Sequence, residues 1–140
     1  MNKYCFDEIQ VGLTESFEVT ITEEQLAAFG QMTGDHNPLH SSEEFAKEKG
    51  FPGKVAYGML TASFLSTLAG VYLPGENSLI HSVEVKFTKP VLVGDVLRIT
   101  GEVKEKNDHF PVFSMNVTIL NQNSEKVLRG TMKVGVIDGE

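Results

Sequence analysis

The sequence predicts an α+β fold in which a curved antiparallel sheet wraps around one long central helix. Residues 56–73 are apolar nearly all round, rich in small residues and ended by Pro-Gly, which is typical of a helix buried on most sides. The segments 83–87, 97–103, 113–119 and 128–136 alternate apolar with polar residues, which is typical of strands with one apolar face. Such a sheet and such a helix must pack together, and the result is the hot-dog architecture.

The first part of the chain adds one strand and two short helices. Residues 14–22 alternate and predict a half-buried strand. Thr22, with Gln25 three positions later, has the pattern of a capping box and predicts a helix over 23–33. A second, short helix is expected after Ser42, which is another good N-cap residue.

Length and composition limit the classes of function. One domain spanning residues 1–140 is expected, because no repeat or linker divides the chain. Twelve basic against nineteen acidic residues give a net charge of −7, which disfavours nucleic acid and anionic membranes as partners. Cys5 is the only cysteine, and no stretch resembles a signal peptide or a membrane span, so we expect a cytoplasmic protein without an intramolecular disulfide. The open sheet edge of this architecture predicts a homodimer or a higher homo-oligomer.

The heptapeptide GDHNPLH, residues 34–40, combines acid–base side chains with a proline. Pro38 is incompatible with helical geometry, so this stretch is predicted to be a loop. A helical metal pair of His36 and His40 is therefore disfavoured, and no metal ion is expected. In a bent loop Asp35 and His40 can instead converge on one water molecule, with the imidazole titrating near neutral pH. The residue types alone leave this acid–base site and an ordinary turn equally open.

Three motifs together resemble one family. They are the heptapeptide, the triplet Gly58-Met59-Leu60 eighteen residues after His40, and the stretch PVLVGD at 90–95. In this order they are similar to the (R)-specific enoyl-CoA hydratases of the MaoC-like dehydratase family. The resemblance implies a cofactor-free hydro-lyase that reversibly hydrates trans-2-enoyl-CoA, or the matching thioester of acyl carrier protein, to the (R)-3-hydroxyacyl thioester. The alternatives are an acyl-CoA thioesterase of the same fold and a non-catalytic module that binds acyl thioesters.

The resemblance also implies roles for individual residues. Asp35 and His40 match the catalytic pair, and Asn37 matches a residue that fixes the loop. The backbone N–H of Gly58 matches the donor to the thioester carbonyl, and Ser66, two turns further on, matches a hydroxyl lying against the catalytic pair. Close helix packing at Gly58 and an ordinary core hydroxyl at Ser66 remain alternatives for these two positions.

One position departs from the family pattern. Tyr57 precedes Gly58 where the family commonly has histidine, which puts the hydrogen bond of that histidine and the surrounding loop geometry in question. Candidates for the acyl pocket, which suit a plain core equally well, are Phe29, Met32, Leu39, Met59 and the stretch 71–80. Candidates for contact with an anionic carrier are Lys86, Lys89 and Arg98.

Overall fold

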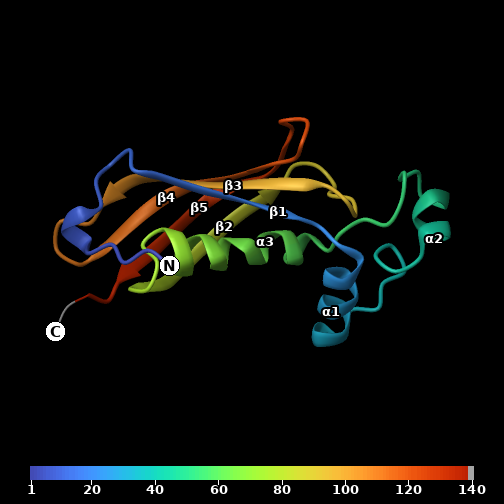
Figure 1. Ribbon diagram of the computed structural model, residues 1–140, viewed down its shortest axis with the longest axis horizontal. Coiled ribbons are helices and arrows are strands. Elements are labelled where there is room, and N and C mark those ends of the chain that lie inside the picture. The colour runs from blue at the N-terminus through green and yellow to red at the C-terminus, as the bar shows by residue number, and fades with distance from the viewer. Residues whose placement is uncertain (139–140) are drawn as a thin grey trace.

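The structure, a computed structural model, describes residues 1–138 and has the predicted α+β architecture. A five-stranded antiparallel sheet, in the order β1-β3-β4-β5-β2, curves over helix α3 (Figure 1). The strands are β1 (Thr14–Thr20), β2 (Ser78–Phe87), β3 (Val96–Lys106), β4 (Val112–Leu120) and β5 (Lys126–Val136). The helices are η1 (Phe6–Glu8), α1 (Glu23–Thr33), α2 (Glu43–Glu48), α3 (Gly58–Thr67) and η2 (Leu68–Tyr72).

Strands β3, β4 and β5 form the centre of the sheet and confirm the predicted alternation. They follow one another as an antiparallel meander, and β1 and β2 add to its two edges. Along β4 the residues at 113, 115, 117 and 119 are buried while their neighbours are partly exposed. Because successive side chains of a strand point to opposite faces, this pattern places one apolar face toward α3.

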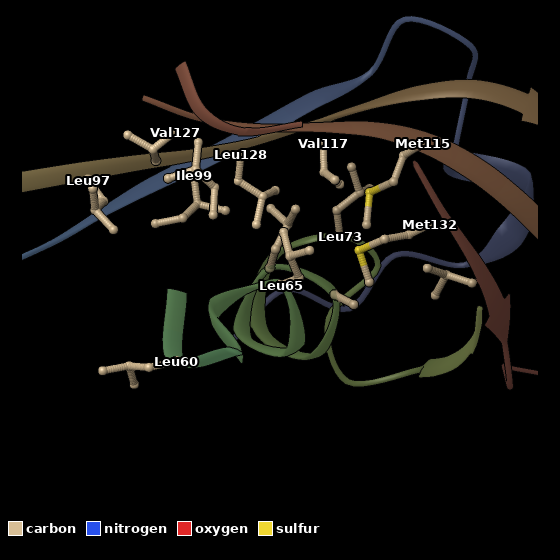
Figure 2. Packing of buried hydrophobic residues seen from close by; sticks show 14 of the residues in the cluster. Leu60, Leu65, Leu73, Leu97, Ile99, Met115, Val117, Val127, Leu128 and Met132 are labelled. Atoms are coloured by element: carbon tan, nitrogen blue, oxygen red, sulfur yellow. The ribbon is translucent and has the colours of Figure 1, made fainter. Parts of the chain in front are cut away.

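The core lies between this face of the sheet and α3. Figure 2 shows Leu65 and Leu73 facing the methionines and aliphatic residues of the central strands. Leu65, Ile99, Met115, Leu128 and Met132 are almost completely buried. Full burial of one such side chain contributes about 1.5–3 kcal/mol relative to exposure, so this layer dominates the stability of the fold.

Helix α3 is shorter than the predicted helix over 56–73. It begins at Gly58. The N–H of Ala56 donates to the carbonyl of Val91 at 2.7 Å, and this bond holds Ala56 in an extended segment before the helix. After Thr67 the chain continues as the π-helical turn η2, in which the N–H of Leu73 donates to the carbonyl of Leu68 at 2.8 Å. The prediction was right about the element and wrong about its N-terminal boundary, which a contact with a distant residue determines.

One face of α3 and most of β2 are exposed in the single chain. On α3, Met59, Ser63 and Ser66 are exposed, although the sequence predicts a helix buried on most sides. On β2, Val83 is 44% and Phe87 49% exposed, although their alternation predicts a buried face. The reason is topological, because β2 is an edge strand and the single chain leaves part of the apolar surface at this edge uncovered.

Helices α1 and α2 lie at one end of the sheet, beyond the start of α3 (Figure 1). The capping box of α1 is confirmed, since Thr22 Oγ1 accepts from the N–H of Gln25 at 3.1 Å and Gln25 Oε1 accepts from the N–H of Thr22 at 3.0 Å. The N-cap of α2 is also confirmed, since Ser42 Oγ accepts from the N–H of Phe45 at 3.1 Å. Within residues 1–138, no helix is both long and apolar enough to cross a bilayer.

Candidate active site

The loop 34–40 is held in shape by its own side chains. It follows α1 at Gly34, whose φ of +77° lies in the left-handed region that favours glycine. Asp35 Oδ1 accepts from the N–H of Asn37 at 3.1 Å, and Asn37 Oδ1 accepts from the N–H of Leu39 at 2.9 Å. These two successive Asx turns fix the direction in which Asp35 leaves the backbone.

His40, at the end of the loop, is oriented by one strong contact. Its Nδ1 lies 2.6 Å from the carbonyl oxygen of Val55. A carbonyl can only accept, so Nδ1 carries the proton and, in the neutral imidazole, Nε2 carries the lone pair. Val55 is buried, which makes this anchor rigid. The second nitrogen of His40 is therefore the one that can act as a base.

Tyr57 contacts both ends of the loop. Its hydroxyl donates to the main-chain carbonyl of Asp35 at 2.8 Å. Its ring stacks on that of His40, with ring centroids 4.0 Å apart and an angle of 29° between the planes. Burial raises the pKa of the Tyr57 phenol, and the negative charge of Asp35 raises it further. The hydroxyl therefore stays protonated, and remains a donor, throughout the neutral range.

Gly58 places the start of α3 beside this loop. The helix has no side-chain cap, because its N-cap residue is Tyr57, whose hydroxyl is bonded elsewhere. The first N–H groups of a helix have no intrahelical partner and carry the positive end of its dipole. A Cβ at position 58 would lie 3.2 Å from the ring of Phe87, so glycine also allows β2 to approach. Both interpretations of Gly58 suggested by the sequence are thus compatible with the structure.

Two cavities meet at His40 and Gly58. The first has a volume of about 350 Å³ and is lined by Phe29, Thr33, Asp35, His40, Tyr57, Gly58 and Met59. The second, of about 380 Å³, has largely apolar walls and includes Leu39, His40, Phe51, Gly58, Thr61 and Phe87. Asp35, His40 and Gly58, which the sequence places 23 positions apart at most, are thereby brought to one site.

The remaining predicted residues separate into two groups. Phe29 and Met59 line the first cavity and Leu39 the second. Met32 is 76% exposed on α1 and lines neither of these two cavities. Ser66 is exposed on α3 and is also outside both, because eight residues of helix separate it from Gly58 by about 12 Å. A single chain therefore does not bring Ser66 to the proposed catalytic pair.

The three candidate cations have different surroundings. Lys89 lines the apolar cavity and pairs with Glu125. Arg98 pairs with Glu18 at 3.4 Å and Ser16 at 3.0 Å on β1. Lys86 is exposed on β2. Of these three residues, only Lys89 lies at one of the two cavities.

The sequence-based predictions missed two contributors to the site. Thr61, one turn into α3, is 2% exposed and lines the apolar cavity, and within residues 1–138 its Oγ1 has no hydrogen-bond partner. Tyr57 was noticed only as a departure from a family pattern. The glycine at position 30, inside helix α1, was an available signal, because an isolated helical glycine commonly has a packing reason. A Cβ there would overlap the Tyr57 hydroxyl.

Known proteins with similar sequences and structures include hydratases and dehydratases. A (R)-specific enoyl-CoA hydratase of Rhodospirillum rubrum is 34% identical over 120 residues, which cover 83% of this chain and 82% of that protein. A 3-hydroxybutyryl-CoA dehydratase of Methylorubrum extorquens is 37% identical over 100 residues, which cover 71% of this chain and 64% of that protein. The structure of an (R)-hydratase from A. caviae involved in PHA biosynthesis superimposes with a TM-score of 0.89 at 30% identity, covering 91% of this chain and 97% of that one.

These relatives are hydratases and dehydratases, which are hydro-lyases, and the matching structure has the same α+β hot-dog fold. The family model described as "MaoC like domain" matches residues 7–125. That range includes the loop 34–40, the segment before α3 and the first four strands of the sheet. The chain therefore belongs to the MaoC-like domain family.

Proposed function

We propose that this chain is a hydro-lyase that reversibly adds water to a trans-2-enoyl thioester and forms the (R)-3-hydroxyacyl thioester. The observation that carries the proposal is that Asp35, His40 and Gly58 line one cavity of about 350 Å³. The relatives named above supply the substrate class, a CoA thioester, and a dehydratase acting on acyl carrier protein is a further relative at 28% identity.

The proposed chemistry uses one water molecule held between Asp35 and His40. Nε2 of His40 takes a proton from the water as its oxygen bonds to C3 of the substrate. The electron pair of the C2–C3 double bond moves toward the thioester carbonyl, whose oxygen becomes enolate-like. A proton then passes from the pair to C2, so that the sum is the addition of H₂O with no oxidation or reduction. The free Nε2 and the fixed Asp35 support these assignments.

The N–H of Gly58 is proposed to hold the thioester oxygen while negative charge develops on it. The uncapped start of α3 supports this role, because both the free N–H and the helix dipole favour a negative oxygen there. By analogy with oxyanion holes in other enzymes, one such donor lowers the barrier by about 3–4 kcal/mol. The role needs only the backbone, so the exchange of histidine for Tyr57 next to it is compatible with activity.

The apolar cavity suits an acyl chain. Its walls carry Leu39, Phe51 and Phe87, and it opens from the same two residues, His40 and Gly58, that flank the first cavity. An acyl chain in this cavity would leave the thioester close to the start of α3. We propose Lys89, at the edge of this cavity, as a contact for the anionic carrier.

The test is hydration of crotonyl-CoA, followed as loss of the ultraviolet absorbance of the conjugated thioester. We expect Asp35→Asn and His40→Ala to lower kcat by about 10²-fold or more, the range for loss of a general acid–base group, while the fold is retained. Unchanged rates in both variants would contradict the assignment. Release of free thiol from saturated acyl-CoA by the parent would instead indicate a thioesterase.

His36→Ala is the matched control for this test. His36 lies on the same exposed loop and lines a neighbouring cavity of about 590 Å³ with Asp35 and His40, but it does not line the cavity that these two residues share with Gly58. We expect this variant to keep kcat within about threefold of the parent, since the general-base term belongs to His40 alone. A loss as large as that of His40→Ala would favour the alternative of a histidine pair acting together on a metal ion.

We also propose that the working unit is at least a homodimer. The exposed residues of β2, among them Val83 and Phe87, and the exposed face of α3 at Met59 are adjacent apolar surfaces. An unpaired edge strand with exposed apolar side chains is a template for a second chain.

A further inference from the structure

Tyr57 joins the two residues of the proposed catalytic pair through different parts of its side chain. The hydroxyl holds the main chain at Asp35, and the ring lies against His40. We propose that Tyr57 is a positioning residue that couples the placement of Asp35 to that of His40, and that Gly30 is the matching position that makes room for it. The inference rests on the proposed function, because it assigns a role within that site.

The ring of His40 is fixed from two directions by one short segment. Val55 accepts from Nδ1 at the ring edge, and Tyr57, two residues later, covers the ring face. The N–H of Val55 also donates to the carbonyl of Leu39 at 3.2 Å, so the backbones of the two segments are joined as well. A ring held at both its edge and its face keeps Nε2 aimed in one direction.

The hydroxyl of Tyr57 acts on the other partner. Asp35 is exposed, and within residues 1–138 its side chain accepts a hydrogen bond only from the N–H of Asn37, so its position relative to His40 depends on further contacts of its backbone. The bond from Tyr57 to the Asp35 carbonyl, at 2.8 Å, is such a contact. Because this hydroxyl donates to a backbone carbonyl, it does not act on the reacting atoms, and Tyr57 is a positioning residue.

Gly30 explains how a bulky phenol fits in this place. Tyr57 is 5% exposed, and its hydroxyl occupies the space where a side chain at position 30 would begin. A Cβ added at position 30 would also lie 3.3 Å from the carbonyl oxygen of Asp35. A glycine in the middle of a helix is unfavourable relative to alanine. The two residues therefore form a pair whose sizes depend on each other.

The pair predicts a specific pattern in a double-mutant cycle of Gly30→Ala and Tyr57→Phe. We expect Tyr57→Phe to lower kcat about 10-fold with KM nearly unchanged, because Asp35 loses its tie to the ring that orients His40. Gly30→Ala should lower kcat further, by about 10²-fold, because the new methyl group displaces the phenol. The double variant should regain activity over Gly30→Ala, since the overlapping oxygen is gone and the nearest remaining atoms are 3.3 and 3.4 Å away.

The division of the effect between kcat and KM separates positioning from a merely structural role. In folded Tyr57→Phe the loss should fall on kcat and leave KM nearly unchanged, because the missing hydroxyl orients the loop at Asp35. The matched control is Tyr4→Phe, which removes a 2.6 Å hydrogen bond from a phenol to Glu15 in another part of the chain. This control should leave kcat and KM as in the parent.

The outcomes of this experiment are distinct. Rescue of Gly30→Ala by Tyr57→Phe, with kcat lowered at nearly unchanged KM in Tyr57→Phe, supports the proposal. Parental kcat in folded Tyr57→Phe, or a loss that falls on KM and not on kcat, overturns it. If the parent hydrates no enoyl thioester, the proposed function itself fails. The coupling of residues 30 and 57 is then measured from the unfolding free energies of the single and double variants. Strictly additive changes in these free energies overturn the pairing.

Discussion

Thr61 is a buried residue whose hydroxyl lowers the free energy of unfolding. Its Oγ1 has no hydrogen-bond partner within residues 1–138, although the side chain is 2% exposed. A buried hydroxyl without a partner costs about 1–3 kcal/mol, whereas an apolar group of the same shape avoids that cost. We expect Thr61→Val to raise the free energy of unfolding by about 1 kcal/mol, measured by urea denaturation at a fixed protein concentration.

Thr88 provides the control for this prediction in the same cavity. Its hydroxyl donates to the carbonyl of Lys126 at 2.7 Å, so Thr88→Val removes a bond that is made. This variant should be less stable than the parent by about 0.5–1 kcal/mol. A loss of stability in Thr61→Val similar to that in Thr88→Val would show that the Thr61 hydroxyl is satisfied in solution.

The loop 34–40 is the element on which the proposed chemistry depends. Its second turn is made by Asn37 Oδ1, which accepts from the N–H of Leu39 at 2.9 Å. Removing this acceptor in Asn37→Ala should let Asp35 and His40 drift relative to each other and lower kcat about 10-fold, with little change in unfolding free energy. Asn37→Asp keeps an acceptor oxygen in the same place and should retain more activity. Equal losses in the two variants, measured with crotonyl-CoA, would mean that the turn is not what matters.

Local signals in the sequence were sufficient for most elements and insufficient for the site. The capping box at Thr22, the proline at 38 and the period of β4 act over a few residues, and each was read correctly. The N-terminal boundary of α3 depends instead on the bond from Ala56 to Val91, which only the folded chain brings together.

The contacts of Tyr57 illustrate the same limit at the site. They join the end of α1, the loop 34–40 and the segment before α3. The bond from Tyr57 to Asp35, for example, links residues 22 positions apart. Period and capping carry no information on such a contact. The sequence pattern could therefore indicate which loop holds the acid–base groups, but not which contacts hold these groups in position relative to each other.

At the scale of the whole molecule, the distribution of burial is uneven. The central strands are packed against α3, whereas β2 keeps apolar side chains on its surface and lies at one edge of the sheet. The alternation of β2 predicted a buried face, and the single chain does not provide one. A second copy of the chain is the simplest surface that could, since a two-fold interface pairs the same edge with itself.

This argument predicts the mass of the assembly and a variant that changes it. Light scattering after size exclusion should give the parent a mass of at least twice 15.4 kDa. Val83→Lys, on the outer edge strand, should shift it toward a single chain, because two-fold symmetry places the new charge at the interface twice. Phe110→Lys is the control, since Phe110 is also an exposed apolar residue (67% against 44% for Val83) but lies in the turn between β3 and β4. A parent of one chain's mass, or equal shifts in the two variants, would mean that the exposed surface of β2 does not pair with a second copy.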